Sequence, residues 1–146
     1  MANTFTVAGG SAWGDLLSVH AVMMRRLEEM LQRDHHLSHG EFEVLLRLSW
    51  APDHRMRIQD LAKDSVLTSS GMSRLVDRLV NAGLVYRETA PEDRRGAYAV
   101  LSDKGDERRV AAEDSNIALV NEIFLSLYTE LELAQMASFW ARFMAK

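Results

Sequence analysis

Residues 67–105 read LTSSGMSRLVDRLVNAGLVYRETAPEDRRGAYAVLSDKG, and this stretch decides the fold of the chain. In its first half apolar residues recur at i, i+3, i+4, i+7 and i+8, which predicts an amphipathic helix with one face against a core. Those residues are Met72, Leu75, Val76, Leu79 and Val80. Thr68 is suited to cap the helix N-terminus, and Asn81, Ala82 and Gly83 are suited to a left-handed C-cap. The helix therefore ends where the apolar period stops.

The opposite face of this predicted helix is polar. It carries Ser69, Ser70, Ser73, Arg74, Asp77 and Arg78. Hydroxyl groups bind phosphates, and guanidinium groups bind phosphates or guanine edges in the major groove. The face therefore predicts a nucleic-acid-reading helix, with Arg74 and Arg78 as candidates for base or phosphate contact.

A β-hairpin is predicted directly after the helix. Residues 84–89 and 97–101 are short runs of alternating or β-branched character, and residues 90–96 between them form a loop with Pro and Gly near its ends. Arg94 and Arg95 lie at the tip, where Asp93 can pair with a neighbouring arginine. Taken alone, such a tip is an ordinary solvated turn. Beside a recognition-type helix it is typical of a wing that contacts the DNA backbone or the minor groove.

Upstream segments complete a helix-turn-helix pattern. Residues 57–64 predict a short helix with Ile58, Leu61 and Ala62 inward. Residues 37–50 predict an earlier helix, capped by Ser38 or His39 and ended by residues 51–54 because proline cannot continue a helix. The order helix, turn, helix, hairpin predicts a mainly α fold with a small β-hairpin wing around a winged helix-turn-helix core.

These segments resemble the MarR family of bacterial transcription regulators. The matching pieces are Leu61-Ala62, SRLVDRL at residues 73–79, GLV at 83–85, PEDRR at 91–95 and LSDKG at 101–105. The resemblance implies a two-fold dimer with intertwined terminal helices, a pseudo-palindromic operator, repression as the usual outcome, and release by a small aromatic or phenolic effector. Gly71 departs from expectation, because glycine weakens a helix interior by roughly 0.5–1 kcal/mol.

Apolar stripes also mark both ends of the chain. One runs from Trp13 to Leu31, and two follow Ile117, separated by a break near residues 129–132. In a monomer these helices leave apolar surface unburied unless they pack on the core, so we expect a homodimer. The expected organisation within one domain is a flexible tail at 1–10, a dimerisation helix at 11–36, the DNA-binding core at 37–105 and further dimerisation helices at 106–146.

Composition limits the function classes. The 146 residues allow one domain, and the absence of cysteine excludes disulfides and thiol-based sensing. The sequence indicates neither a signal peptide nor a membrane span, so we expect a cytoplasmic protein. The net charge is −4, but residues 55–109 carry 11 Lys and Arg against 9 Asp and Glu, and the remainder carries 6 against 12. The predicted DNA-binding part is thus the positive part of an acidic chain.

Enzyme and metal functions are disfavoured. The segment from Gly71 begins like a nucleophile elbow but lacks the second glycine, and the five histidines include no H-E-x-x-H motif. We therefore expect no enzyme activity, metal or cofactor, although His35, His36 and His39 lie close enough in sequence to consider zinc. A winged-helix module that binds a protein instead of DNA stays an alternative.

The residues predicted to contact partners fall into two sets. Expected at double-stranded DNA are Thr68, Ser69, Ser70, Ser73, Arg74, Arg78, Arg94 and Arg95. Expected at an effector are Trp13, His20, Met24, Arg47 and Trp50, which combine two cationic or titratable groups with apolar and aromatic ones. For His20, a hydrogen-bonded place in a dimer interface is the alternative role.

Overall fold

The computed structural model describes residues 7–63, 65, 67–90 and 96–145. These residues divide into two compact units. The first, from Arg26 to Glu113, holds the helix-turn-helix segments, and the second combines the two ends of the chain, up to Arg25 and from Asp114 onward.

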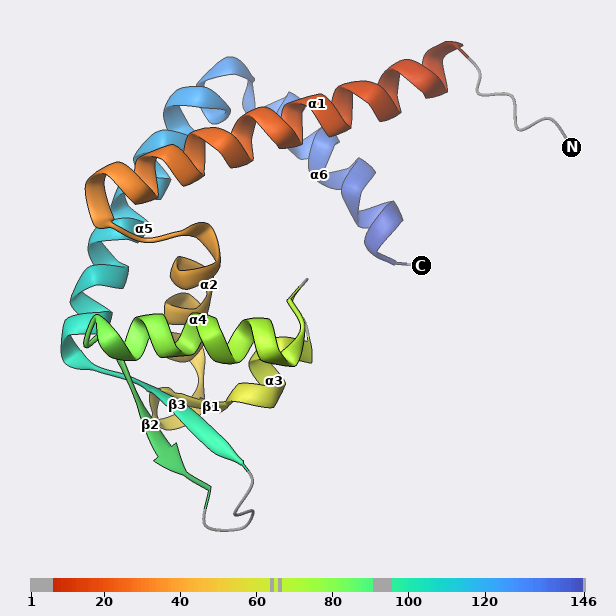
Figure 1. Ribbon diagram of the computed structural model, residues 1–146. Helices are drawn as coiled ribbons and strands as arrows, with labels where there is room; N and C mark the ends of the chain where they lie inside the picture. The colour runs from red at the N-terminus through yellow and green to blue at the C-terminus, as the bar shows by residue number, and fades with distance from the viewer. Residues whose placement is uncertain (1–6, 64, 66, 91–95, 146) are drawn as a thin grey trace, which may run out of the picture. The chain divides into compact units, whose positions relative to one another are not determined.

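The first unit contains the helices α2 (His39–Trp50), α3 (Ile58–Lys63) and α4 (Ser69–Asn81), together with a small sheet. The hairpin of β2 (Val85–Thr89) and β3 (Ala97–Leu101) projects away from the helices, as Figure 1 shows. Both strands are antiparallel, with Val85 opposite Leu101 and Thr89 opposite Ala97. The predicted fold class, a mainly helical chain with a small β-hairpin wing, is confirmed.

A third strand was not predicted. Residues Arg55–Arg57 form β1, which pairs with β3 and gives the sheet order β1-β3-β2. The prediction that the short helix begins at Arg57 is therefore wrong, because that residue lies in the strand and α3 begins at Ile58. The cause is the preceding turn, in which Asp53 and His54 both adopt positive φ and direct the chain alongside β3. A three-residue strand is too short to show an alternating pattern.

The core of this unit comes from the apolar positions that the periodicity indicated. In α4, Met72, Leu75, Val76 and Leu79 are all at most 3% exposed. Similarly buried side chains elsewhere in this unit are Leu31, Leu45, Leu48, Leu61, Leu84 and Ala99. Burying a leucine side chain contributes roughly 1.5–3 kcal/mol, so this shared core holds α4 firmly in place.

The ends of the helices match their sequence signals. Ser38 caps the N-terminus of α2 through a capping box. Its hydroxyl accepts the Glu41 N–H, and the Glu41 carboxylate accepts the Ser38 N–H. At the C-terminal end of α4, Gly83 has a φ of 73°. The Gly83 N–H donates to the Val80 carbonyl, and the Leu84 N–H donates to the Leu79 carbonyl. This is the left-handed termination that the sequence predicted.

The second unit consists of helical segments from both ends of the chain. They belong to α1 (Val7–Met30), α5 (Asp103–Ile123) and α6 (Glu130–Met144). Because α1 begins at Val7, four residues expected in the flexible tail are helical. The break was predicted near residues 129–132, but α5 already ends at Ile123 and α6 begins at Glu130, where Thr129 caps it through a capping box with Glu132. None of the helices described is long and apolar enough to cross a membrane.

Candidate nucleic-acid interface

The polar face of α4 is accessible. Ser69, Ser70 and Arg74 are exposed, and Ser73 is partly exposed. Since Met72, Leu75 and Val76 anchor the opposite face in the core, these four side chains occupy a fixed side of a rigid helix. An exposed row of hydroxyls ending in a guanidinium matches the donor groups that read a DNA groove.

Thr68 has a structural role at the start of this helix. Its Oγ1 accepts the Gly71 N–H at 3.1 Å and lies 3.1 Å from the Ser70 hydroxyl. A Cβ added at Gly71 would lie 3.3 Å from the same Oγ1, which is a tight contact. The glycine that departed from helical expectation therefore leaves room for the cap.

Arg74 is the exposed cation of this face. In the part of the chain that the structure describes, no hydrogen bond or ion pair engages its guanidinium. An exposed guanidinium that carries no internal partner retains its full donor capacity for a phosphate or a base edge.

Arg78 is placed differently from Arg74. Its Nε donates to Glu41 Oε1 at 2.8 Å, and the Glu41 side chain is only 13% exposed whereas that of Arg78 is 58% exposed. Burial by itself would raise the pKa of Glu41, but hydrogen bonds from the Ser38 N–H and from Arg78 lower that pKa overall. The structure thus connects one predicted DNA contact to the beginning of α2.

Arg87 on β2 was not predicted as a functional residue. One of its terminal nitrogens, Nη2, donates to Asp77 at 2.8 Å and to the Ser73 hydroxyl at 3.2 Å. The partner of Asp77, a residue of the polar face of α4, therefore lies on the wing. Only the folded arrangement brings these two segments together.

The tip of the wing falls outside the described residues. Asp93, Arg94 and Arg95 belong to this segment, so their predicted roles stay predictions. At the base of the tip, the Ala90 N–H donates to the Gly96 carbonyl at 3.2 Å and continues the pairing of the hairpin.

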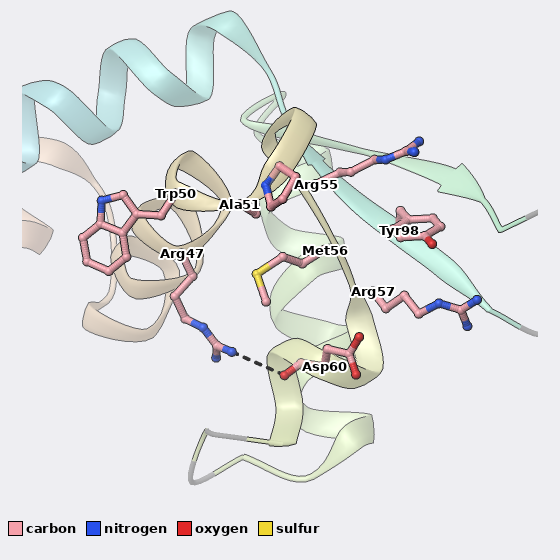
Figure 2. Close-up of a pocket in the computed structure, with 9 residues that line it drawn as sticks. Arg47, Trp50, Ala51, Arg55, Met56, Arg57, Asp60 and Tyr98 are labelled. Carbon is pink, nitrogen blue, oxygen red and sulfur yellow. Dashed lines mark hydrogen bonds between the residues drawn. The ribbon is translucent and has the colours of Figure 1, made fainter.

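The predicted effector residues divide between the two units. Arg47 and Trp50 line an open pocket of about 490 Å³ in the first unit, and Figure 2 shows them on one side with Arg55, Arg57 and Tyr98 on the other. The guanidinium of Arg47 donates to the carbonyls of Leu61 and Asp60 at 2.9 and 3.3 Å. Trp13, His20 and Met24 belong to the second unit.

The pocket has an unusual stack of side chains at its β-sheet wall. The guanidinium carbons of Arg55 and Arg57 lie 5.0 and 5.5 Å from the centre of the Tyr98 ring. These are cation–π distances. Arg55 also forms an ion pair with Glu88 at 3.3 Å. Among the described residues no cluster of three or more His, Asp or Glu side chains is placed to hold a metal ion.

Comparison with known proteins identifies the family. The sequence model of the MarR family matches residues 37–96. The chain is also similar to AbsC, a MarR family transcriptional regulator from Streptomyces coelicolor, at 30% identity and a TM-score of 0.88, with 99% of this chain and 97% of AbsC covered. The chain belongs to the MarR family. This assignment confirms the resemblance and places the chain among transcriptional regulators, not enzymes.

Two further relatives of this MarR family chain are informative. Sco3205, a MarR family regulator from Streptomyces coelicolor crystallised in complex with DNA, is 27% identical with a TM-score of 0.88, covering 99% of this chain and 90% of Sco3205. The HTH-type transcriptional repressor YetL of Bacillus subtilis (strain 168) is 38% identical over 72 residues, which are 49% of this chain. That match spans only 43% of YetL, so this chain corresponds to less than half of that relative.

Proposed function

We propose that this MarR family protein is a homodimeric repressor that binds a pseudo-palindromic operator in double-stranded DNA. The observation that carries the proposal is the exposed Ser69, Ser70, Ser73 and Arg74 face of α4, held rigid by the buried apolar face of the same helix. Arg94 and Arg95 at the wing tip would add contacts to the backbone or the minor groove. The DNA complex of Sco3205 and the name of YetL support this class of activity.

Exposed apolar side chains of the helical unit support the homodimer. Phe143 is 73% exposed, Leu131 69%, Phe139 55% and Trp13 54%. Monomeric proteins rarely leave so many large apolar groups in water, and a second copy of the same unit would cover them. Two α4 helices about one helical turn of DNA apart, ~34 Å, would then meet two operator half-sites.

The proposal can be tested by selecting bound duplexes from a random pool and titrating the selected duplex by fluorescence anisotropy. We expect a two-fold symmetric consensus whose affinity falls steeply with salt, because phosphate neutralisation releases counterions. Arg74→Gln should weaken binding by roughly fivefold or more, since one arginine contact contributes roughly 1–3 kcal/mol.

A matched control is Arg33→Gln, which removes an exposed arginine that pairs with its neighbour Asp34 in the π-helical turn Leu31–His35 after α1. This variant should bind as the wild type does. If the wild type selects no duplex even at low salt, the regulator function is wrong, and the winged-helix unit is better explained as a protein-binding module.

An effector site is the further part of the proposal. Arg47 and Trp50 would contribute a cation and an aromatic surface for a small aromatic or phenolic anion, and the effector contacts expected of Trp13, His20 and Met24 stay predictions. Binding would lower DNA affinity by favouring a different spacing of the two recognition helices.

Thermal unfolding with benzoate and with the neutral benzyl alcohol tests the effector site. A ligand that binds only the folded state raises the midpoint temperature of unfolding. At a ligand concentration one hundred times the Kd, the free energy of unfolding increases by about 2.7 kcal/mol. We expect a shift with benzoate alone, reduced by Trp50→Ala. No shift with saturating benzoate would contradict this effector class.

A further inference from the structure

Two consecutive residues of α4 connect this helix to two different parts of the winged-helix unit. Asp77 accepts a hydrogen bond from Arg87 on β2, and Arg78 donates to Glu41 at the beginning of α2. Successive residues of an α-helix point about 100° apart around its axis. The two ion pairs therefore hold the helix from two directions.

Arg78 binds a carboxylate, that of Glu41, whose position is fixed by other partners. Glu41 is largely buried, and its second carboxylate oxygen accepts the Ser38 N–H at 2.9 Å within the capping box of α2. The adjacent His39 N–H donates to Glu28 at 2.7 Å, near the end of α1. Because the carboxylate is fixed by its own partners, it can fix the guanidinium that binds it.

The connection through Arg87 lies beside the groove-reading face. The same Nη2 that binds Asp77 also donates to the hydroxyl and the carbonyl of Ser73, at 3.2 and 3.3 Å. Arg87 is itself on β2, which pairs with β3 over the full length of both strands. The middle of β2 is thus bonded to α4 at Ser73 and Asp77.

The apolar core holds α4 in place, but apolar contacts are non-directional, so directional ion pairs add a further constraint on the rotation of the helix about its axis. Side chains extend about 5–6 Å from the helix axis, so a rotation of about 20° moves their ends by about 2 Å. Such a shift exceeds the tolerance of a hydrogen bond to DNA. Two directional ion pairs at neighbouring positions would prevent it.

We propose that Glu41 and Arg87 are positioning residues that set the rotation of α4, and that Arg78 acts through Glu41 and does not contact DNA. The inference rests on the proposed DNA binding. Failure of the wild type to bind any duplex would contradict the proposed function, whereas a wild type that binds allows the inference to be tested by itself.

The test removes the two acidic partners and leaves every arginine in place. In Glu41→Gln the capping box can persist, because glutamine also serves at this position. In Asp77→Asn the side chain keeps its shape. Electrostatics alone predicts that removing a negative charge beside DNA tightens binding. We expect the opposite, a loss of affinity of roughly twofold to thirtyfold in each variant, the size of ordinary coupling between sites.

Arg78 is tested by the salt dependence of binding, measured on the selected duplex. If Arg78 bound a phosphate, its replacement would reduce the slope of log K against log salt by about 0.9 per protomer. We expect Arg78→Gln to weaken binding with an unchanged slope, and the pair Glu41→Gln with Arg78→Gln to be little weaker than either single variant. Arg78→Lys should recover part of the affinity, since it keeps a charge that Glu41 can bind.

Glu107→Gln is the matched control, because it removes an exposed acid from α5 in the same unit without touching α4. It should bind as the wild type or slightly tighter. All variants are compared at a temperature where circular dichroism shows them folded. Unchanged or tighter binding by Glu41→Gln and Asp77→Asn, or a reduced salt slope in Arg78→Gln, would overturn the proposal.

Discussion

The two units of this protein both contain amphipathic helices but differ in how they bury apolar side chains. All the buried apolar residues described, from Met30 to Ala112, lie in the winged-helix unit, and none of the described side chains of the helical unit is buried. Helical periodicity alone therefore does not make a core. The winged-helix unit is stabilised by its own packing, whereas the helical unit leaves its apolar side chains exposed, at the surface where we propose that a second copy binds.

The largest expected effect tests whether the winged-helix unit is stabilised by its own core. Leu45 is fully buried in α2, so Leu45→Ala should lower the free energy of unfolding by about 2–5 kcal/mol through weaker packing and a residual cavity. Urea unfolding measures the change. The loss should not depend on protein concentration, and Leu46→Ala, at a less buried position of the same helix, should cost clearly less.

The next effect tests the helical unit. Phe143 in α6 is 73% exposed, and Phe143→Asp places a charge on the surface that we propose is shared between copies. An aromatic residue central to an interface contributes about 2–4 kcal/mol, so we expect the dimer to dissociate roughly thirtyfold or more readily.

Sedimentation across a range of concentrations measures this dissociation. The same substitution should leave the unfolding of the winged-helix unit nearly unchanged, and Glu130→Gln on the same helix is the control for a change of charge. If Phe143→Asp sediments as the wild type does, the proposed dimer surface is wrong.

A third, smaller effect follows from the ionised Glu41. Its pKa is lowered in the folded state, so its contribution to stability is present above the ordinary glutamate pKa and is lost as the pH falls through the lowered value. At pH 7 Glu41→Gln should cost about 1.5–3 kcal/mol, the range for a hydrogen bond to a charged group.

The free energies of unfolding of wild type and Glu41→Gln should therefore converge as the pH is lowered from 7 to 3. Urea titrations at several pH values measure this convergence. A difference that stays constant over this range would contradict the assignment of the effect to the Glu41 charge.

The sequence predicted those features that depend on neighbours along the chain. The period of α4, the cap at Thr68 and the left-handed turn at Gly83 are all local, and each is confirmed. Strand β1 and the partners of Arg78 and Arg87 were missed, because they join residues that are distant in sequence. A polar face on a helix predicts which side chains are outside the core, but not which of them are already engaged by another element.

Gly105 shows the same limit. It was recognised only as part of the LSDKG motif, yet a Cβ at this position would lie 2.0 Å from the Leu84 carbonyl oxygen. Real Cβ atoms do not approach backbone so closely, so the first turn of α5 can pack against the start of the wing only if residue 105 lacks a side chain. No pattern within the motif indicates that contact.

The smallest effect concerns Gly71, where local propensity and local geometry oppose each other. Alanine in a helix interior is favoured over glycine by roughly 0.5–1 kcal/mol. Here its Cβ would press on Thr68 Oγ1, which cannot withdraw without losing the cap, worth about 1 kcal/mol. We therefore expect Gly71→Ala to be neutral or destabilising by at most about 0.5 kcal/mol.

The helical preference for alanine and the strain on the Thr68 cap can be measured separately with Thr68→Ala. In that background the hydroxyl is gone, and Gly71→Ala should increase the free energy of unfolding by its full helical advantage. Urea unfolding of the two single variants and the double variant gives the coupling between the positions. If Gly71→Ala stabilises the wild type as much as it stabilises Thr68→Ala, the glycine does not serve the cap, and its place on the groove-reading helix becomes the better reason for its presence.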